Sequence, residues 1–472
     1  MRRLTIATLA LLWLPTVAAD GGFDDRFTGA TLRVDFFHSG TAGEEHFALD
    51  RLRVEGSWPG SRTRLLDPTN LGNYLVEVVD LATNAVLYSR GFASIYGEWE
   101  TTGEALAGVW RTLPEAVRVP EAREPFQLRL RKRQPDQSFA EVWGLTIDPA
   151  SRFVDRAPVT KRNVHVILES GDPSIKLDLV VLGDGYRAGA MDKFHADAER
   201  LAAALFAEEP FASRKSDFNV RAVDSPSSQS GVSRPRAGIF RESALGARYN
   251  SFDSERYVLS LEDRKWRDVA AAVPYDAVLI LVNERKYGGG GIFNLYSTAA
   301  ADSAFADYLV VHEFAHHLGA LADEYFTSSI AYEELADRRI EPWEPNVTAL
   351  LDPEKLKWAD LVERETPLPT PWDQERFEER SRESQAQRRK LRAGGATEET
   401  LEQLFRDEQR VMTEMLGSQE YAGRIGAYQG AMYQSRGLYR PAVDCIMFTR
   451  DEVGYCAVCR RGLERVIDLY TR

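Results

Sequence analysis

Residues 308–321 have the sequence YLVVHEFAHHLGAL, in which apolar side chains occur on nearly every turn. That pattern predicts a buried helix. His312 and His316 are four positions apart, so a helix stacks both imidazoles on one face, where they can reach a single cation. Glu313 is rotated about 100° from His312, which lets it face a water at the metal without being a ligand. The stretch therefore predicts a helix that carries a catalytic metal site.

The spacing His-Glu-x-x-His has a chemical reason. Zinc lowers the pKa of a bound water from about 15.7 to near 7, and Glu313 can then accept the proton as a general base. The chain has only 7 histidines, so a chance match on an apolar helix is improbable. The alternative is a helix with two satisfied core histidines. His317 points about 100° away from the ligand face, so we expect it to support the site or to be exposed.

The third zinc ligand must come from outside this pair, because a catalytic zinc usually has three protein ligands and a water. Gly319 tolerates the positive φ of a helix C-terminal cap, so we expect the chain to turn back there. That turn brings Asp323 within reach, and it is the preferred third ligand. The alternatives are Glu324, Glu333 and Glu334.

The segments around this helix alternate between strand and helix patterns, which indicates an α/β domain. The predicted strands and helix are Val164–Leu168, Leu177–Leu182, Met191–Ala207 (helix) and 276–283. We place a zinc metallopeptidase domain at residues 156–472. Residues 372–417 are rich in Glu, Arg and Gln, and they predict a charged helical hairpin inserted in this domain. We expect that hairpin to be a solvated structural arm, because charge runs usually mark exposed faces.

Residues 31–147 have a different pattern, with short alternating apolar and polar runs separated by turn residues. Period-2 alternation without intervening helices predicts an antiparallel β-sandwich. We place this N-terminal domain at residues 20–155. The basic run at 129–133 predicts an edge strand whose charges discourage pairing with other chains.

The first 19 residues have the pattern of a Sec-type signal peptide: a charged start, an apolar run from Leu4 to Leu14, and a small-residue site ending at Ala19. The apolar run is shorter than the roughly 20 residues that a spanning helix needs, and no later segment is long enough either. We therefore expect a secreted or periplasmic protein without a membrane span.

Charge and cysteine content exclude several other classes. A net charge of -13 without a polybasic tract argues against binding to nucleic acid or to an anionic membrane.

The three cysteines of the chain, Cys445, Cys456 and Cys459, lie in the last 30 residues, so the fold is not a disulfide-stapled scaffold. An oxidising compartment favours one bridge and one free thiol. The Cys456–Cys459 pair also has the spacing of half a zinc ribbon, but the second pair of ligands is missing.

The segment HEFAHHLGALADEY, residues 312–325, resembles the peptidase M64 family, a group named for an IgA-cleaving metallopeptidase. Other segments also resemble that family: Lys286–Asn294, Gly437–Pro441, Cys445–Met447 and, in the β-rich part, Tyr88–Phe92 and Glu98–Thr102. The β-rich part thereby resembles the family's N-terminal domain. The resemblance covers most of the chain that follows the predicted signal peptide.

The resemblance implies that the zinc ligands are His312, His316 and Asp323. It also implies that Glu313 is the catalytic base and that Met447 occupies a methionine turn beneath the metal, as in metzincin-like peptidases. The third histidine position of metzincins, six residues after His316, is Ala322 here. The match to that wider group therefore depends on Asp323.

Two further features are candidates for substrate contacts. Gly289 and Gly290 lie in a run of four glycines at 288–291. A strand without side chains lets another backbone approach, so this run either pairs with an extended substrate or is a flexible loop. Tyr439 is a candidate donor to the developing oxyanion, although packing explains most tyrosines.

These features favour a secreted zinc endopeptidase that acts on protein or peptide substrates, with one catalytic zinc ion. One alternative is an exported binding or adhesion protein whose metal site is structural or vestigial; the presence of Glu313 argues against it. Another is a zinc amidase that hydrolyses cell-wall peptide, because the same chemistry permits it.

Overall fold

The computed structural model describes residues 22–328, 331–332 and 336–471. The predicted signal peptide, residues 1–19, lies outside the described residues, and so do Glu333 and Glu334. Among the described residues, no helix is both long and apolar enough to cross a membrane.

The N-terminal part of the chain consists of two four-stranded sheets, with strand orders β5-β1-β2-β8 and β4-β3-β6-β7. Every strand pairing is antiparallel except that between β2 and the short β8. Buried side chains of both sheets, such as Val34 and Leu128, form one core. The predicted β-sandwich is confirmed. Its strands are β1 Phe27–Gly40, β2 Glu45–Ser57, β3 Tyr74–Asp80, β4 Val86–Phe92, β5 Arg111–Ala122, β6 Phe126–Arg133, β7 Phe139–Ile147 and β8 Val154–Asp155.

The prediction that the basic run is an edge strand is wrong. β6 lies between β3 and β7, and its arginines face acidic residues on those neighbours. Arg131 Nε lies 3.3 Å from Glu77 Oε2 on β3, and Arg129 Nε lies 3.7 Å from Glu141 Oε2 on β7. Phe126, Leu128 and Leu130 alternate with them and are buried. The arginines of β6 therefore lie on the outer face of an internal strand.

A six-stranded sheet of order β15-β16-β14-β10-β11-β9 carries the second part of the chain. Its four central strands are parallel, while the edge strands β15 and β9 are antiparallel to their neighbours. β10 is buried along its whole length, as expected for a central strand with both faces covered. The bounds are β9 Val164–Leu168, β10 Leu177–Asp184, β11 Phe218–Val223, β14 Ala277–Val282, β15 Gly289–Ile292 and β16 Tyr296–Ala300.

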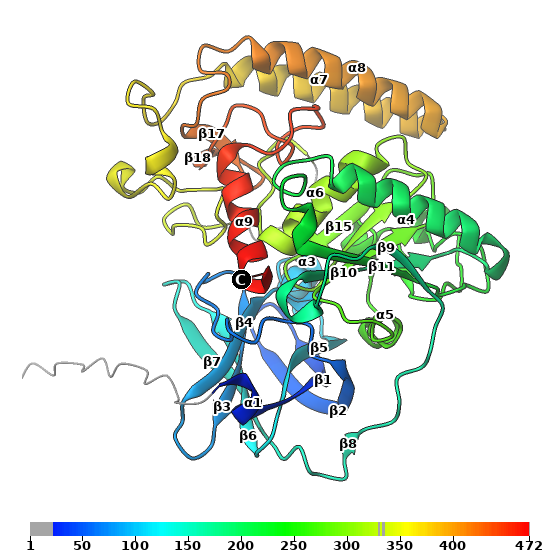
Figure 1. The fold of residues 1–472 in the computed structure, drawn as a ribbon. Helices are drawn as coiled ribbons and strands as arrows, with labels where there is room; N and C mark the ends of the chain where they lie inside the picture. Colours follow the sequence, from blue (N-terminus) through cyan, green and yellow to red (C-terminus); the bar gives the residue numbers. More distant parts are fainter. Residues whose placement is uncertain (1–21, 329–330, 333–335, 472) are drawn as a thin grey trace, which may run out of the picture.

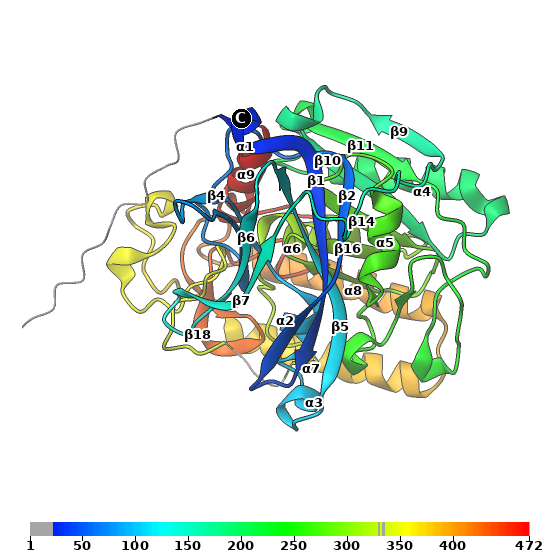
Figure 2. The same ribbon diagram turned by 90° about the horizontal axis from the view of Figure 1, so that it is seen from below.

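Helices α4 (Met191–Leu205) and α6 (Ala306–Gly319) pack together on one side of this sheet, and α9 (Ala457–Thr471) packs against α6. The β-sandwich and α5 (Asp263–Ala270) lie on the opposite side (Figure 1). From below, the long strands β1, β2 and β5 run across the front of the sheet (Figure 2). The largest apolar core includes residues of both parts, for example Trp99 and Leu279. The fold is therefore a sandwich docked on an α/β domain, as predicted.

Two long helices, α7 (Gln374–Ala393) and α8 (Glu398–Gly417), lie side by side across the top of the α/β domain (Figure 1). Thr397 caps α8, because its hydroxyl accepts a hydrogen bond from the backbone N–H of Thr400. The inner face of this pair is buried: Phe405 is 4% exposed and packs on Tyr287 and Phe305. The expectation of a solvated arm is wrong for that face.

The remaining elements are short and connect these layers. They are α1 Phe23–Arg26, α2 Ile95–Trp99, α3 Gly103–Leu106, β12 Ala247–Arg248, β13 Leu259–Ser260, β17 Tyr428–Ala431 and β18 Gln434–Arg440.

Candidate active site

Helix α6 is the predicted ligand-bearing helix, and His317 fixes its position against the sheet. His317 is 2% exposed and points into the core. Its Nε2 accepts a hydrogen bond from the backbone N–H of Val278 on β14 (3.0 Å), and its Nδ1–H donates to the carbonyl oxygen of Ile292 on β15 (3.2 Å). Burial lowers the pKa of His317 to about 4, so the imidazole is neutral and satisfied at both nitrogens.

The chain turns back after α6, but not at the expected residue. Ala320, not Gly319, adopts the left-handed conformation, with φ of 54°. Gly319 is the last helical residue, and a Cβ there would lie 2.7 Å from Leu463 Cδ2 on α9. The glycine therefore serves close helix packing. The reversal still returns the chain toward the helix, where Asn346 Oδ1 accepts a hydrogen bond from the N–H of Ala322 (2.8 Å).

This reversal brings together the three residues proposed as ligands. His312 Nε2 and His316 Nε2 lie 3.2 Å apart. Asp323 Oδ1 lies 3.1 Å from the first nitrogen and 3.2 Å from the second. Ligands held at about 2.0–2.1 Å from a tetrahedral ion are separated by roughly 3.3 Å. The three donor atoms therefore fit one face of a zinc coordination polyhedron.

Hydrogen bonds at Nδ1 of both imidazoles fix the direction in which the Nε2 lone pairs point. His312 Nδ1–H donates to the carbonyl oxygen of Ile446 (3.0 Å), and His316 Nδ1–H donates to that of Leu321 (2.5 Å). Both Nε2 lone pairs therefore point at Asp323 and at each other, an arrangement that needs a cation or a proton at its centre. Burial works to lower the pKa of His316, but the Asp323 carboxylate outweighs it and raises that pKa to about 9.

Glu313 is half-buried beside this triad and lines the same cavity. Burial raises the pKa of its carboxyl, although the imidazoles of His312 and His316 oppose the shift. Glu324, the nearest alternative ligand, is fully buried elsewhere: its Oε1 accepts hydrogen bonds from Asn346 Nδ2 (3.0 Å) and from the thiol of Cys459 (3.3 Å). The structure thus brings Asp323, and not Glu324, to the two histidines.

Met447 lies in a segment that contacts the site, and the residues that follow it, Phe448 and Thr449, line the cavity. The residue is fully buried, and its carbonyl oxygen accepts a hydrogen bond from the N–H of Glu324 (2.9 Å). The preceding residue, Ile446, supplies the carbonyl that receives His312 Nδ1–H. The segment thus contacts both the ligand helix and the loop that carries Asp323.

The triad opens into a cavity of about 290 Å³. Its walls come from every part of the chain: Gly289 to Ile292 of β15, Phe377 and Arg388 of α7, Glu408 and Met412 of α8, and Asn73 and Glu98 of the sandwich. The N-terminal domain and the helical pair therefore both contribute to the surface that a substrate would meet.

The run of glycines forms the edge strand β15 and not a flexible loop. The strand lies directly against α6: a Cβ on Gly291 would lie 2.1 Å from the carbonyl oxygen of Glu313 and 2.9 Å from His316 Cβ. On Gly289 it would lie 3.0 Å from Glu313 Cγ. Only glycine permits this approach of the strand to α6.

Several tyrosines surround the site, and sequence spacing gave no signal for them. Tyr433 Oη donates a hydrogen bond to Asp323 Oδ2 (2.5 Å). Tyr332 Oη donates to Glu98 Oε2 (2.6 Å) and also lies 2.6 Å from Tyr257 Oη. Their segments are far apart in sequence, so only the fold brings them together.

Tyr439, the expected oxyanion donor, is not part of this group. Its backbone N–H and carbonyl both pair with Thr348 (2.8 and 3.0 Å), and its side chain does not line the described cavity. Tyr439 is held in β18, and this position gives no support to the expected oxyanion role.

Comparison with known families agrees with this geometry. The family IgA Peptidase M64 matches residues 165–467, and the domain Peptidase M64 N-terminus matches residues 22–144. The first span contains the ligand helix, and the second contains the β-sandwich. A comparison with curated proteins finds no matching relative. The chain belongs to the IgA peptidase M64 family and is a peptidase that acts on protein or peptide substrates.

Proposed function

We propose that the protein is an exported, zinc-dependent endopeptidase with Glu313 as its general base. The observation that supports this most directly is the convergence of His312 Nε2, His316 Nε2 and Asp323 Oδ1 within 3.1–3.2 Å. A carboxylate that is not a ligand lies beside them on the same helix. A structural or vestigial site has no need of that carboxylate.

His312, His316 and Asp323 would hold the zinc ion. When bound, zinc supplies Lewis-acid polarisation of the scissile carbonyl and lowers the pKa of an attacking water to near 7. The carbonyl groups of Ile446 and Leu321 orient the two imidazoles toward the ion, and Tyr433 orients the Asp323 carboxylate. Such outer contacts fix ligand geometry before substrate arrives.

Glu313 moves the proton. Because burial raises its pKa, its carboxylate is more basic than an exposed glutamate and is better matched to proton transfer near neutral pH. It accepts a proton from the attacking water and donates it to the leaving nitrogen, so the amine departs in neutral form.

The edge of β15 is suited to an extended peptide. Gly288 O accepts from Ala300 N on β16, so antiparallel alternation turns the backbone groups of Gly290 toward β16 and those of Gly289 and Gly291 outward. The outward groups of Gly289 already pair with Arg256 and Val258. We therefore assign the substrate contact to Gly291, where the strand faces the cavity, in place of Gly289 and Gly290.

Gly291 would pair with the backbone of an extended peptide and would not recognise a chain end, which favours endopeptidase action. Export is supported by the pattern of residues 1–19. N-terminal sequencing of the protein isolated from the periplasm or culture medium should begin at Asp20. A mature chain that still begins at Met1 would contradict export by this route.

The decisive experiment compares wild type, Glu313→Gln and the exposed control Glu383→Gln for zinc content and for cleavage of a broad peptide library. We expect all three to hold the same amount of zinc. Glu313→Gln should lose at least about 100-fold in kcat, the usual scale for removing a general base, while Glu383→Gln cleaves like wild type. Equal cleavage by all three would overturn the assignment of Glu313, and a wild type that cleaves no peptide would favour a binding protein.

A further inference from the structure

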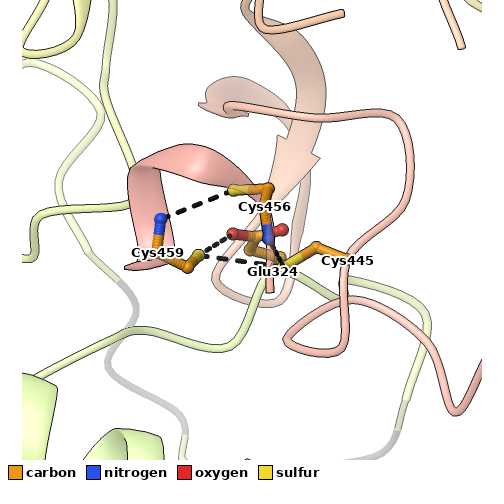
Figure 3. Close-up of side chains that lie close together, drawn as sticks. All are labelled: Glu324, Cys445, Cys456 and Cys459. Carbon is orange, nitrogen blue, oxygen red and sulfur yellow. Dashed lines mark hydrogen bonds between the residues drawn. The ribbon is translucent and has the colours of Figure 1, made fainter. Parts of the chain in front are cut away.

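A second group of potential ligands lies next to the triad, at the start of α9. Cys456 and Cys459 meet Cys445 and Glu324 there, and one ligand atom from each lies within 4.8 Å of all the others (Figure 3). All three cysteines are free, so the expected disulfide is absent from the described structure. The second pair of ligands that the sequence did not reveal is Cys445 with Glu324.

The distances suit a tetrahedral ion. Cys445 Sγ and Cys459 Sγ lie 3.8 Å apart, and two sulfurs bound at about 2.3 Å to a tetrahedral zinc are separated by roughly 3.8 Å. Cys459 Sγ lies 3.3 Å from Glu324 Oε1. Figure 3 shows the carboxylate of Glu324 directed between the sulfurs.

Glu324 forms no direct ion pair in the described part of the chain, although it is buried. Glu324 is 0% exposed, its Oε1 is held by Asn346, and its Oε2 has no hydrogen-bond partner in the described part of the chain. The buried guanidinium of Arg440 acts favourably on this charge from nearby, but its hydrogen bonds go to backbone carbonyls, including those of Gly430 and Val443. Buried carboxylates are normally paired or bound to metal, so this one has the surroundings of a ligand.

Backbone groups also prepare the sulfurs for a cation. The N–H of Cys456 donates to Cys445 Sγ (3.4 Å), and the N–H of Cys459 donates to Cys456 Sγ (3.5 Å). These hydrogen bonds disperse the negative charge of thiolates. The Cys-x-x-Cys pair also lies at the N-terminal end of the 15-residue helix α9, where the helix dipole favours negative charge.

We propose that Glu324, Cys445, Cys456 and Cys459 bind a second, structural zinc ion. Three thiolates and one carboxylate fill all four positions of a tetrahedral site, which is the pattern of structural zinc and leaves no position for water. The ion would bring the net charge of the four ligands, of which only Cys456 is partly exposed, from -4 to -2 and would protect the thiols from oxidation outside the cell.

The position of this site gives it a role in catalysis through other residues. Glu324 follows Asp323 directly, and Cys445 precedes Ile446, whose carbonyl receives His312 Nδ1–H. The second ion would therefore clamp the loop that carries the third catalytic ligand to the segment that orients the first. Its ligands would be positioning residues, and its loss should weaken metal binding at the triad.

Cobalt substitution of the full-length wild-type protein tests the proposal without a variant. Only the second site has sulfur ligands, so the proposal predicts sulfur-to-cobalt charge-transfer absorption in the near ultraviolet. His316→Ala, which removes a triad ligand, should keep that absorption. The half-exposed Cys456→Ser should diminish it, even if that variant folds less well. Survival of the signal in inactive His316→Ala separates this proposal from the peptidase assignment.

Metal and thiol counts supply the second measurement. Wild type purified without reductant should contain about two zinc ions per chain and His316→Ala about one, and all three cysteines should react with an alkylating reagent after denaturation and chelation. A cobalt protein without charge-transfer absorption would overturn the proposal. So would an unreduced chain in which only one cysteine is alkylated, because that result identifies a disulfide.

Discussion

Tyr433 Oη donates a hydrogen bond to Asp323 Oδ2 (2.5 Å), while the other oxygen of the same carboxylate lies 3.1 Å from His312 Nε2. The backbone repeats this link, because the N–H of Met432 donates to the carbonyl oxygen of Asp323 (3.0 Å). The turn between β17 and β18 therefore holds both the main chain and the side chain of the proposed third ligand. One carboxylate oxygen is anchored so that the other can face the metal.

Removing that anchor should weaken the metal site without abolishing it. Tyr433→Phe keeps the ring and loses the hydrogen bond, so zinc affinity should fall about 10–100-fold, as for other contacts that orient a metal ligand. Competition for zinc with a chromophoric chelator measures this affinity. Tyr439→Phe is the matched control and should bind zinc like wild type, because Tyr439 does not line the cavity. Equal affinities for both variants would show that Asp323 needs no anchor.

The close approach of β15 to α6 predicts that alanine is not tolerated at Gly291. Its Cβ would lie 2.1 Å from the carbonyl oxygen of Glu313, so strand or helix must shift, at a cost of about 3 kcal/mol or more in the free energy of unfolding. Gly417→Ala is the control: no atom lies within 4 Å of a Cβ there, and alanine in a helix stabilises by roughly 0.5–1 kcal/mol. Denaturant unfolding compares them, and a Gly291→Ala protein as stable as wild type would mean that the strand lies further from the helix.

His38 in the sandwich predicts a pH dependence of stability. Its ring stacks on Tyr96 with centroids 3.7 Å apart, and its two nitrogens contact Glu115 (2.9 Å) and Glu45 (3.1 Å). Burial works to lower the pKa of His38, but the two carboxylates outweigh it and raise that pKa. Lys132 also contacts Glu45 and shares its charge.

A raised folded pKa means that the folded protein binds the proton more tightly than the unfolded chain does. The stabilisation is therefore complete below the unfolded pKa of about 6.5 and is lost as pH rises through the higher folded value. The difference in melting temperature between wild type and His38→Gln should be largest near pH 6 and should shrink toward alkaline pH. A difference that is constant across this range would show that His38 is not charged in the folded protein.

The ligand helix could be predicted from sequence because its information is local. Two histidines at four-residue spacing on an apolar segment predict a helix that holds both imidazoles on one face, and α6 has that form. The same holds for the sandwich strands, whose alternation is local too. Strand order is not local, which is why the basic run wrongly predicts an edge. β7 follows β6 in a hairpin, but β3, whose Glu77 faces Arg131, is adjacent to β6 only in the fold.

The supporting residues could not be predicted for the same reason. Met432 and Tyr433 both have positive φ, at 45° and 65°, in a two-residue hairpin turn that normally favours Asn-Gly. Local preference is overridden there because the turn contacts Asp323. Glu324 is a candidate catalytic ligand by its nearness in sequence, yet the fold turns its carboxylate toward Cys459. Deviations of this kind are expected where function constrains the backbone.

The packing of the α7–α8 pair against the α/β domain leads to a final prediction, which concerns substrate binding. Phe405 lies 5.8 Å from the ring centroids of both Tyr287 and Phe305, and the guanidinium of Arg450 covers it at 4.4 Å. Phe405→Ala should cost about 3–5 kcal/mol of docking energy and should let the two helices separate from the domain.

The helices α7 and α8 line the cavity, and among the described residues the hydrogen bonds of the triad go to other elements. We therefore expect Phe405→Ala to raise KM for a long peptide while kcat changes little. Limited proteolysis should also cut the 394–397 connection faster. Gln403→Ala, an exposed change on the same helix, should leave both measurements unchanged. If KM for Phe405→Ala equals that of wild type while the connection is cut faster, detachment of the helices does not affect substrate binding. The cavity wall they form would then not be part of the substrate site.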